Sequence, residues 1–377
     1  SAYCDLKASN SFAANSHQRL FTGASGSRYF SNGRVPDKSR SPEVNESKVV
    51  PGGLSGVMSD GVGSGDEIVE RHDEMMGWKG ALKFEAEGCL IPHPRKVKKG
   101  GEDSLMVGDR HLAVADGVGG WEQVGVDSGK FSKEFMYHVR THTLKTESWK
   151  TYVSPINTMT WAVKRTRATG SSTCCLAFLD RLEQEDDGPA RALLRTANLG
   201  DSGLIVFRTS HGKCIHQTEE QLHDFNFPRQ LGTGCTDTPA DSDQHEVVVH
   251  EGDVVVLATD GVWDNVFVEE IERILLLFND KPVADIAQTI ALMAFEKSAD
   301  SKFISPFCVK EFEHFGAANQ GGKPDDISVV VARVINETKP LSEVSFLLEH
   351  RNVLTDRICE FQVWLIFSIL FQIQFIK

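Results

Sequence analysis

Two apolar runs of this chain, residues 112–115 and 254–258, lead into an Asp-Gly turn, and a third, residues 327–331, starts directly after an Asp-Asp pair. Short apolar runs bounded by Gly and Asp predict β-strands. Strand ends lie close together at the edge of a sheet, so we expect these carboxylates to converge. Clustered carboxylates repel one another and need hard cations, most simply Mg²⁺ or Mn²⁺. The pattern predicts a metal-dependent hydrolase built on Asp116, Asp260, Asp325 and Asp326.

Composition excludes several other classes. The chain has 377 residues, of which 40% are apolar and 25% charged, as expected for a globular core. Its net charge of −13 argues against a nucleic-acid partner, which would require a basic surface. None of the eight cysteines forms a C-x-x-C pair, so a zinc site is not expected, and we predict a reducing compartment.

Three segments are predicted along the chain. Residues 1–75 are rich in Ser, Gly and Asn and should form a disordered targeting and linker segment. Within the first 35 residues, three arginines and one lysine stand against a single acid, which resembles an organelle transit peptide. An ordinary disordered tail is the alternative. Residues 76–338 should form the folded domain, and residues 339–377 a C-terminal tail.

The C-terminal tail contains an uncharged stretch, residues 361–376, in which twelve of sixteen residues are apolar. The stretch is short for a membrane span and includes three glutamines. Membrane contact through this tail, a packed helix or strand, and an artefact such as a translated intron all stay open.

Between these tails, short strands and longer amphipathic helices are predicted. The grouping of strands around helices favours an α+β layered fold over strict β-α alternation. The strands are expected at 105–107, 112–115, 173–179, 192–198, 204–208, 246–249, 254–259 and 327–334, and the helices at 130–144, 154–167, 268–278 and 283–297.

The spacing of the acids suggests how they could work. Asp103 follows Glu102 in one acidic turn, and Asp116 lies in the next, thirteen residues after Asp103. This spacing suits a hairpin of neighbouring strands. Two ions about 4 Å apart could share a bridging carboxylate and activate a water as nucleophile. Each motif alone would more simply be a turn. Their joint occurrence beside strand-like runs favours the metal site.

Six motifs, in order, resemble those of the type 2C protein phosphatases, which are metal-dependent serine/threonine phosphatases. The resemblance covers residues 78–336 and rests on residues 101–103, 115–121, 170–173, 198–203, 258–261 and 323–328. Residues 118–121, 225–228 and 305–307 look most like the organellar branch, with mitochondrial matrix and plastid members. The resemblance implies a four-layer αββα fold, a central β-sandwich of two antiparallel sheets flanked by α-helices.

The resemblance also implies roles for individual residues. It implies two Mn²⁺ or Mg²⁺ ions, possibly a third, and a variable flap over residues 268–320. Asp116 would bridge the ions, and Gly117 would coordinate through its carbonyl. The remaining implied ligands are Asp260 and Asp325 at the first ion, Glu102 and Asp103 at the second and Asp201 near the third, with Asn265 and Asp326 orienting ligands and waters.

Two departures from the family pattern concern the general acid and the phosphate contact. Val118 stands where many members carry His, which leaves His93 and His111 as weak candidates for the acid. Lys98, followed by Lys99, stands where many members carry an Arg. A lysine supplies charge to a phosphate but lacks the bidentate fork of arginine.

The sequence therefore predicts a protein serine/threonine phosphatase with a phosphoprotein substrate. We expect a monomer in the mitochondrial matrix, with plastid and cytoplasm as alternatives. The rival hypothesis is a catalytically silent scaffold that binds a phosphoprotein, suggested by the missing His and Arg. The complete set of predicted ligands argues against it. A trypsin-like nucleophile at Ser202 is disfavoured because a strand follows directly, where a Gly-rich loop would be needed.

Overall fold

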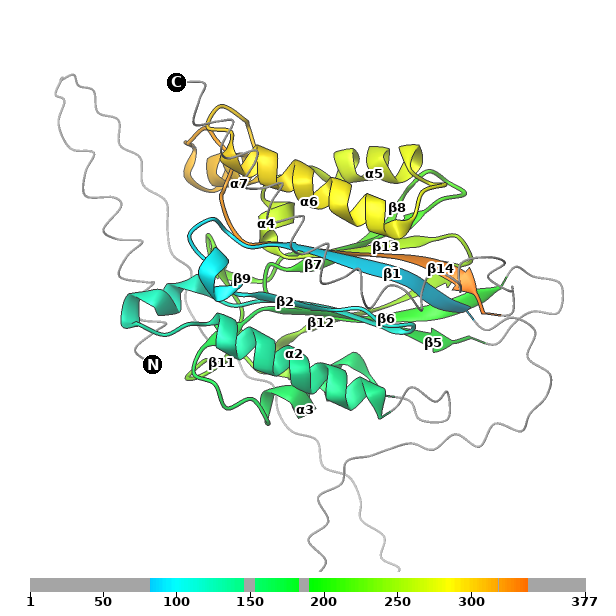
Figure 1. The fold of residues 1–377 in the computed structure, drawn as a ribbon, viewed down its shortest axis with the longest axis horizontal. Helices are drawn as coiled ribbons and strands as arrows, with labels where there is room; N and C mark the ends of the chain where they lie inside the picture. Colours follow the sequence, from blue (N-terminus) through cyan, green and yellow to red (C-terminus); the bar gives the residue numbers. More distant parts are fainter. Residues whose placement is uncertain (1–81, 146–152, 183–189, 318, 338–377) are drawn as a thin grey trace, which may run out of the picture.

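The computed structural model describes residues 82–145, 153–182, 190–317 and 319–337. In this part of the chain two antiparallel sheets pack face to face, and helices cover both outer faces (Figure 1). The predicted four-layer αββα arrangement is confirmed. The predictions for residues 1–75, the acidic segment 183–189 and the tail 339–377 concern segments outside the described residues.

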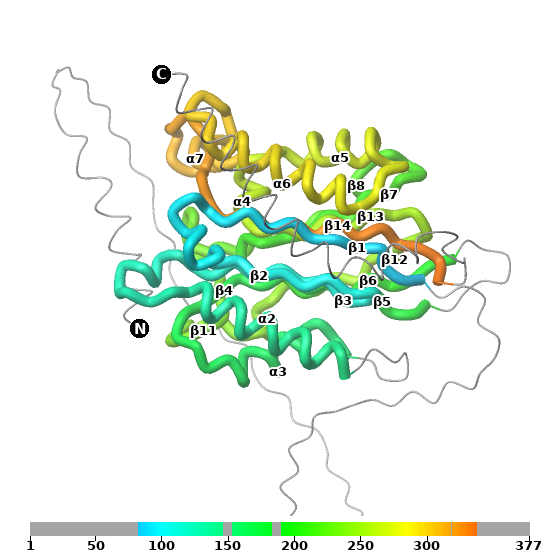
Figure 2. Tube along the Cα trace, viewed as in Figure 1, coloured from blue at the N-terminus to red at the C-terminus, as the bar shows by residue number. Residues whose placement is uncertain are grey.

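Each sheet has five strands, and all neighbours run antiparallel. Figure 2 shows the first strand beside the last, and Leu82 pairs with Asn336 in this ladder. The first sheet has the order β1 (Leu82–Ile91), β14 (Ile327–Asn336), β13 (Val254–Ala258), β7 (Gly203–Arg208) and β8 (Lys213–Gln217). The second has the order β12 (Asp243–His250), β6 (Arg191–Leu199), β5 (Cys174–Arg181), β3 (His111–Asp116) and β2 (Asp103–Met106).

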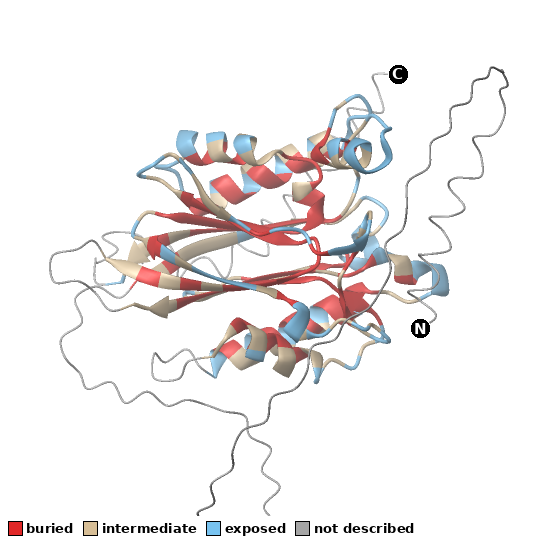
Figure 3. Cartoon of the chain, turned by 180° about the vertical axis from the view of Figure 1, so that it is seen from behind, coloured by how far each residue is buried: buried red, intermediate tan, exposed pale blue. Residues whose placement is uncertain are grey.

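Side-chain alternation along the central strands divides the core into layers. In β14, Val329 and Val331 pack toward the helices, whereas Val330 and Ala332 face the other sheet. A strand covered on both faces reads as a continuous apolar run, which explains the uninterrupted valines of β13 and β14. Figure 3 shows the resulting buried residues on both sheets.

Helices lie on the outer faces of the two sheets (Figure 1). Helices α2 (Gly129–Leu144) and α3 (Pro155–Val163) cover the second sheet. Helices α4 (Asp260–Trp263), α5 (Val268–Leu277), α6 (Val283–Ala299) and α7 (Pro306–Phe315) lie on the side of the first. No helix within the described ranges is long and apolar enough to cross a membrane.

The expectation that residues 268–320 form a flap beside the site is wrong for most of this range. Ile271 of α5 and Ile290 of α6 are fully buried against the first sheet, so both helices belong to the core. The part that lies beside the site is α7, since its Phe307 ring lies 5.0 Å from the ammonium of Lys323. Its N-cap Ser305 accepts a hydrogen bond from the Cys308 N–H.

Short elements complete the end of the sandwich where the predicted ligands lie. They are the strands β4 (Ser171–Ser172), β9 (Leu222–Asp224), β10 (Phe227–Pro228) and β11 (Leu231–Gly232), and the 3-10 helices η1 (Val97–Lys99), η2 (Gly119–Val124) and η3 (Pro239–Asp241).

Candidate active site

The strand ends of both sheets meet at one end of the sandwich. In the hairpin of β2 and β3, Asp103 pairs directly with Asp116, as the spacing of the acidic turns predicts. Asp260 opens α4 just after β13, and Asp325 lies just before β14. The Thr259 hydroxyl donates a hydrogen bond to Asp103 Oδ2 over 2.8 Å and so joins the two sheets.

Asp326 makes a second connection between the sheets. Its side chain is 1% exposed and accepts hydrogen bonds from the backbone N–H groups of His93 (2.7 Å) and Glu102 (2.9 Å). The ammonium of Lys96 lies 3.0 Å from Oδ2 of the same carboxylate. One carboxylate thus holds the loop before β2 against the segment before β14.

Gly117 is required where β3 leaves the sheet. Its N–H donates to the Glu102 carbonyl over 3.1 Å. A Cβ at this position would stand 2.7 Å from that oxygen and 2.9 Å from the Ser128 carbonyl oxygen. Only a residue without a side chain allows the backbone to pass this close.

A pocket of about 160 Å³ opens among these strand ends. Such a volume suits a phosphoryl group with a short side chain rather than a longer ligand. Its walls come from both sheets and from the β9–β10 hairpin, and they consist of Lys96, Asp116, Gly117, Val118, Gly119, Gly120, Asp201, Asn226, Pro228, Asp260, Lys323 and Asp325.

Three carboxyl groups in and around this pocket have raised pKa values, because their surroundings disfavour the ionised form. Burial, with the charge of Asp326 second, raises the pKa of Asp103 to about 8. Burial and then the charges of Asp103 and Asp260 raise the pKa of Asp116 well above its usual range. The pKa of Asp201 is raised in the same way, by burial and then by Asp260. This end of the protein therefore favours the binding of positive charge.

Two lysines supply part of that charge. Lys96 Nζ lies 2.7 Å from Glu102 Oε2 and 3.4 Å from Asp325 Oδ1. Lys323 Nζ lies 2.5 Å from Asp260 Oδ2 and 2.6 Å from Asp264 Oδ2. Burial alone would lower the pKa of Lys323, but the charges of Asp260 and Asp264 outweigh it and raise the pKa well above its usual range.

The lysines that line the pocket are Lys96 and Lys323, and not the predicted Lys98 and Lys99. Lys98 and Lys99 are exposed and do not line the pocket, and Lys99 instead pairs with Glu122 at 3.0 Å. The loop turns at Gly100 and Gly101, which adopt φ of 74° and 71°. With this turn the chain directs Lys96, two residues earlier than expected, into the pocket. The sequence reading missed both Lys96 and Lys323.

The donor set fits hard divalent cations. Asp103 Oδ1, Asp201 Oδ1 and Asp260 Oδ1 are buried without a hydrogen-bond partner, which costs free energy unless a cation completes them. Carboxylate oxygens are the ligands that Mg²⁺ and Mn²⁺ prefer. Across the described ranges no three His, Cys, Asp or Glu side chains are grouped closely enough to hold one ion, and the ammonium groups of Lys96 and Lys323 lie among the carboxylates.

The remaining predicted residues are also placed. Asn265 is fully buried, and its amide donates to the Gly261 and Lys323 carbonyls, 2.9 Å each, so it fixes the Lys323 loop. Val118 lines the pocket. His93 lies beside Asp326 through its backbone N–H. His111 opens β3 at the end opposite Asp116 and is not brought to the pocket, which removes it as a candidate acid.

Comparisons with known proteins agree with this geometry. A family profile described as stage II sporulation protein E matches residues 107–335. The probable protein phosphatase 2C 80 of Arabidopsis thaliana is 37% identical over 259 residues, which cover 67% of this chain and 59% of that protein. The protein phosphatase PTC7 homolog fig of Drosophila yakuba is 36% identical over 278 residues, which cover 67% of this chain and 82% of that protein.

A solved structure, that of the photosystem II phosphatase PBCP, is 33% identical and superposes with a TM-score of 0.58. The match covers 67% of this chain and 98% of that one. The chain spans less than two thirds of the length of the Arabidopsis relative. The family profile matches more than half of this chain, the match to the Drosophila relative covers 82% of that protein, and the chain belongs to the type 2C family of protein phosphatases.

Proposed function

We propose that this chain is a metal-dependent protein serine/threonine phosphatase that hydrolyses phosphoserine and phosphothreonine in proteins. One observation carries the proposal. Carboxylates from both sheets line a 160 Å³ pocket in which buried oxygens of Asp201 and Asp260 have no hydrogen-bond partner. This arrangement supports the binding of two Mn²⁺ or Mg²⁺ ions.

In the proposed site, Asp116, Gly117, Asp260 and Asp325 would hold one ion, and Glu102, Asp103 and Asp116 the other. The ions, when bound, would activate a water and neutralise a phosphoryl group. Lys96 and Lys323 add positive charge to the walls of the pocket, where they would attract the phosphoryl oxygens. Thr259 and Asp326 hold Asp103 and the Glu102 backbone, which fixes the ligands before substrate arrives.

A third ion near Asp201 would have to share its place with Lys323. The ammonium of Lys323 already contacts Asp260 and Asp264, and its charge also acts on Asp201. We therefore propose two ions as the working complement. Equilibrium dialysis with Mn²⁺ that finds a third ion bound as tightly as the first two would contradict this count.

The test of the function is release of phosphate from a phosphothreonine peptide by the full chain. We expect turnover with Mn²⁺ or Mg²⁺ and none with EDTA, because the proposed ions activate the attacking water. An okadaic-acid-type inhibitor should have little effect. If the folded, Mn²⁺-loaded protein releases no phosphate yet binds the peptide, the silent scaffold replaces the phosphatase as the proposed function.

We propose further that the protein is a monomer that acts in an organelle, most simply the mitochondrial matrix. The arginine-rich, acid-poor first 35 residues support import, and the solved relative, a photosystem II phosphatase, keeps the plastid as an alternative. Residues 1–75 fused to a fluorescent protein should enter mitochondria. A fusion that stays in the cytosol would show that residues 1–75 alone do not direct import. Size-exclusion chromatography with light scattering tests the monomer.

A further inference from the structure

A larger groove adjoins the catalytic pocket. It has a volume of about 510 Å³ and lies between the β9–β10 hairpin and α7. Asp201 and Asn226 line both the groove and the 160 Å³ pocket, so the two are continuous. A phosphorylated side chain seated in the smaller pocket would leave the neighbouring residues of its polypeptide at the entrance to the groove.

The groove has an aromatic wall built from both elements. The ring of Phe225, near the hairpin tip, lies 5.2 Å from Phe307 and 5.0 Å from Phe315 between centroids, and 5.4 Å from His314. The next residue, Asn226, adopts φ of 52°, a left-handed conformation that asparagine tolerates better than most residues. This turn presents Phe225 toward α7.

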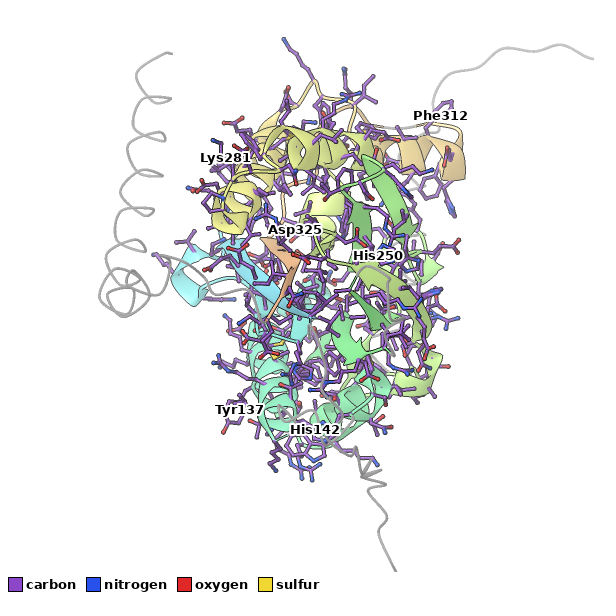
Figure 4. All side chains as sticks on the ribbon, turned by 90° about the vertical axis from the view of Figure 1, so that its right-hand side faces the viewer. Tyr137, His142, His250, Lys281, Phe312 and Asp325 are labelled. Atoms are coloured by element: carbon purple, nitrogen blue, oxygen red, sulfur yellow. The ribbon has the colours of Figure 1, made fainter. Side chains whose placement is uncertain are left out.

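Aromatic surface is also left open to solvent at this place. Phe315 is 59% exposed although it packs against Phe225, and Phe312 one turn earlier on α7 is equally exposed. Figure 4 shows Phe312 at the outer end of the helical layer. Exposed aromatic side chains beside a polar rim are typical of protein interaction sites.

The charge of the groove is acidic. Its floor is neutralised, because the ammonium of Lys310 contacts Glu220 and lies 2.8 Å from Asp264. At the rim, Asp224 accepts a hydrogen bond from the Phe225 N–H over 2.8 Å, and the nearest basic group to it among the described residues is His314, at 3.8 Å. Glu313 forms no ion pair with any described residue. The uncompensated charge of the rim is therefore negative and would attract basic side chains.

We propose that this groove binds the segment of the substrate polypeptide next to the phosphorylated residue, and that it selects an apolar side chain flanked by Lys or Arg. The apolar side chain packs on Phe225 and Phe307, and the basic side chain pairs with Asp224 or Glu313. The inference rests on the proposed phosphatase function, for which it names the class of substrate sequence.

The test compares two phosphothreonine peptides with each other as substrates of the full, Mn²⁺-loaded chain. One carries Leu and Arg on both sides of the phosphothreonine, and the other carries Ser and Glu at the same positions. We expect kcat/KM to be about 10-fold higher for the first peptide, the effect of one or two well-placed contacts. The variants Phe225→Ala and Glu313→Lys should each reduce this preference about 5-fold, through KM.

Matched controls separate the groove from the chemistry. The same variants should leave hydrolysis of p-nitrophenyl phosphate unchanged, because that substrate is too short to enter the groove. Tyr137→Ala removes an exposed aromatic side chain on α2, at the opposite end of the layered molecule in Figure 4, and Asp280→Lys reverses an exposed acid before α6. Both should keep the peptide preference.

A binding measurement keeps the inference independent of turnover. Fluorescence anisotropy with Asp116→Asn, which should retain the groove, measures the affinity for each labelled peptide directly. Tighter binding of the Leu-Arg peptide that is lost on adding Phe225→Ala supports the groove even if no phosphate is released. Equal binding of the two peptides, or a parallel loss of p-nitrophenyl phosphate hydrolysis in Phe225→Ala, would overturn it.

Discussion

Asp116→Asn should lower kcat by at least about 100-fold, because it removes a carboxylate charge that would hold the proposed ions. This factor corresponds to about 3 kcal/mol of transition-state stabilisation. Asp116 lies opposite Asp103 in the β2–β3 ladder and lines the pocket together with Asp260. In the proposed site, Asp116 would help to hold both ions. Phosphate release from a phosphothreonine peptide at saturating Mn²⁺ measures the loss.

The same substitution should stabilise the protein in EDTA. Burial and neighbouring acids raise the folded-state pKa of Asp116, so its ionised form at neutral pH destabilises the metal-free protein. This cost is absent below the unfolded-state pKa, grows as pH rises from that value towards the raised folded-state pKa, and is constant above it. A neutral amide of the same size removes it, and Tm should rise by about 2 °C or more at pH 7.

The control for this prediction is Asp280→Asn, at a side chain that is 77% exposed. It should change neither kcat nor Tm. Wild-type turnover in Asp116→Asn would place the chemistry elsewhere, and a large fall in its Tm would show that Asp116 serves the fold rather than the metals.

Asp326→Ala should lower the free energy of unfolding by about 3–5 kcal/mol, the usual cost of removing one partner of a buried charged pair. The change leaves the N–H groups of His93 and Glu102 and the ammonium of Lys96 without this acceptor. Urea denaturation in EDTA measures the loss without a contribution from bound metal.

Two further substitutions make the Asp326 result specific. Asp326→Asn retains one oxygen acceptor and should lose less stability than the alanine variant. Asp280→Ala removes an exposed carboxylate and should stay within about 0.5 kcal/mol of the wild type. A loss below about 1 kcal/mol in Asp326→Ala would mean that the two sheets are not held together through this side chain.

Strands β3, β13 and β14 could be read from the sequence because most of their residues are buried on both faces. Such strands appear as continuous apolar runs, as in β13 and β14. The hairpin that pairs Asp103 with Asp116 followed from the spacing of two acidic turns. Helices α2, α3, α5 and α6 followed from their apolar periodicity.

Strand β1 was missed although it carries a readable signal. Leu82 and Phe84 face the core between charged residues, which is the alternation of a strand with one polar face. Gly88 then interrupts the pattern, because a side chain there would stand 2.9 Å from Leu105. Helix α7 has start and stop signals at Ser305 and Gly316, but its ten residues give a weak period.

The pocket lysines could not be placed by sequence reasoning. Which lysine of residues 96–99 enters the pocket depends on the left-handed turn at Gly100 and Gly101 and on the contacts of Lys96 with Asp325 and Asp326, which lie far away in the sequence. Lys323 stands two residues before a predicted ligand, where a loop lysine is equally compatible with solvent. Its capture by Asp260 and Asp264 depends on α4, which brings those two acids onto one turn.

The pairing of the first and last described strands has a consequence for synthesis on the ribosome. Strand β14 lies between β1 and β13, so β1 has no neighbour to pair with in its sheet until residues 327–336 have been synthesised. Contacts between such distant segments form late, after the chain has lost the entropy of closing a long loop. Asp325 arrives with that strand, so the chain acquires its complete set of acids only as its sheet closes.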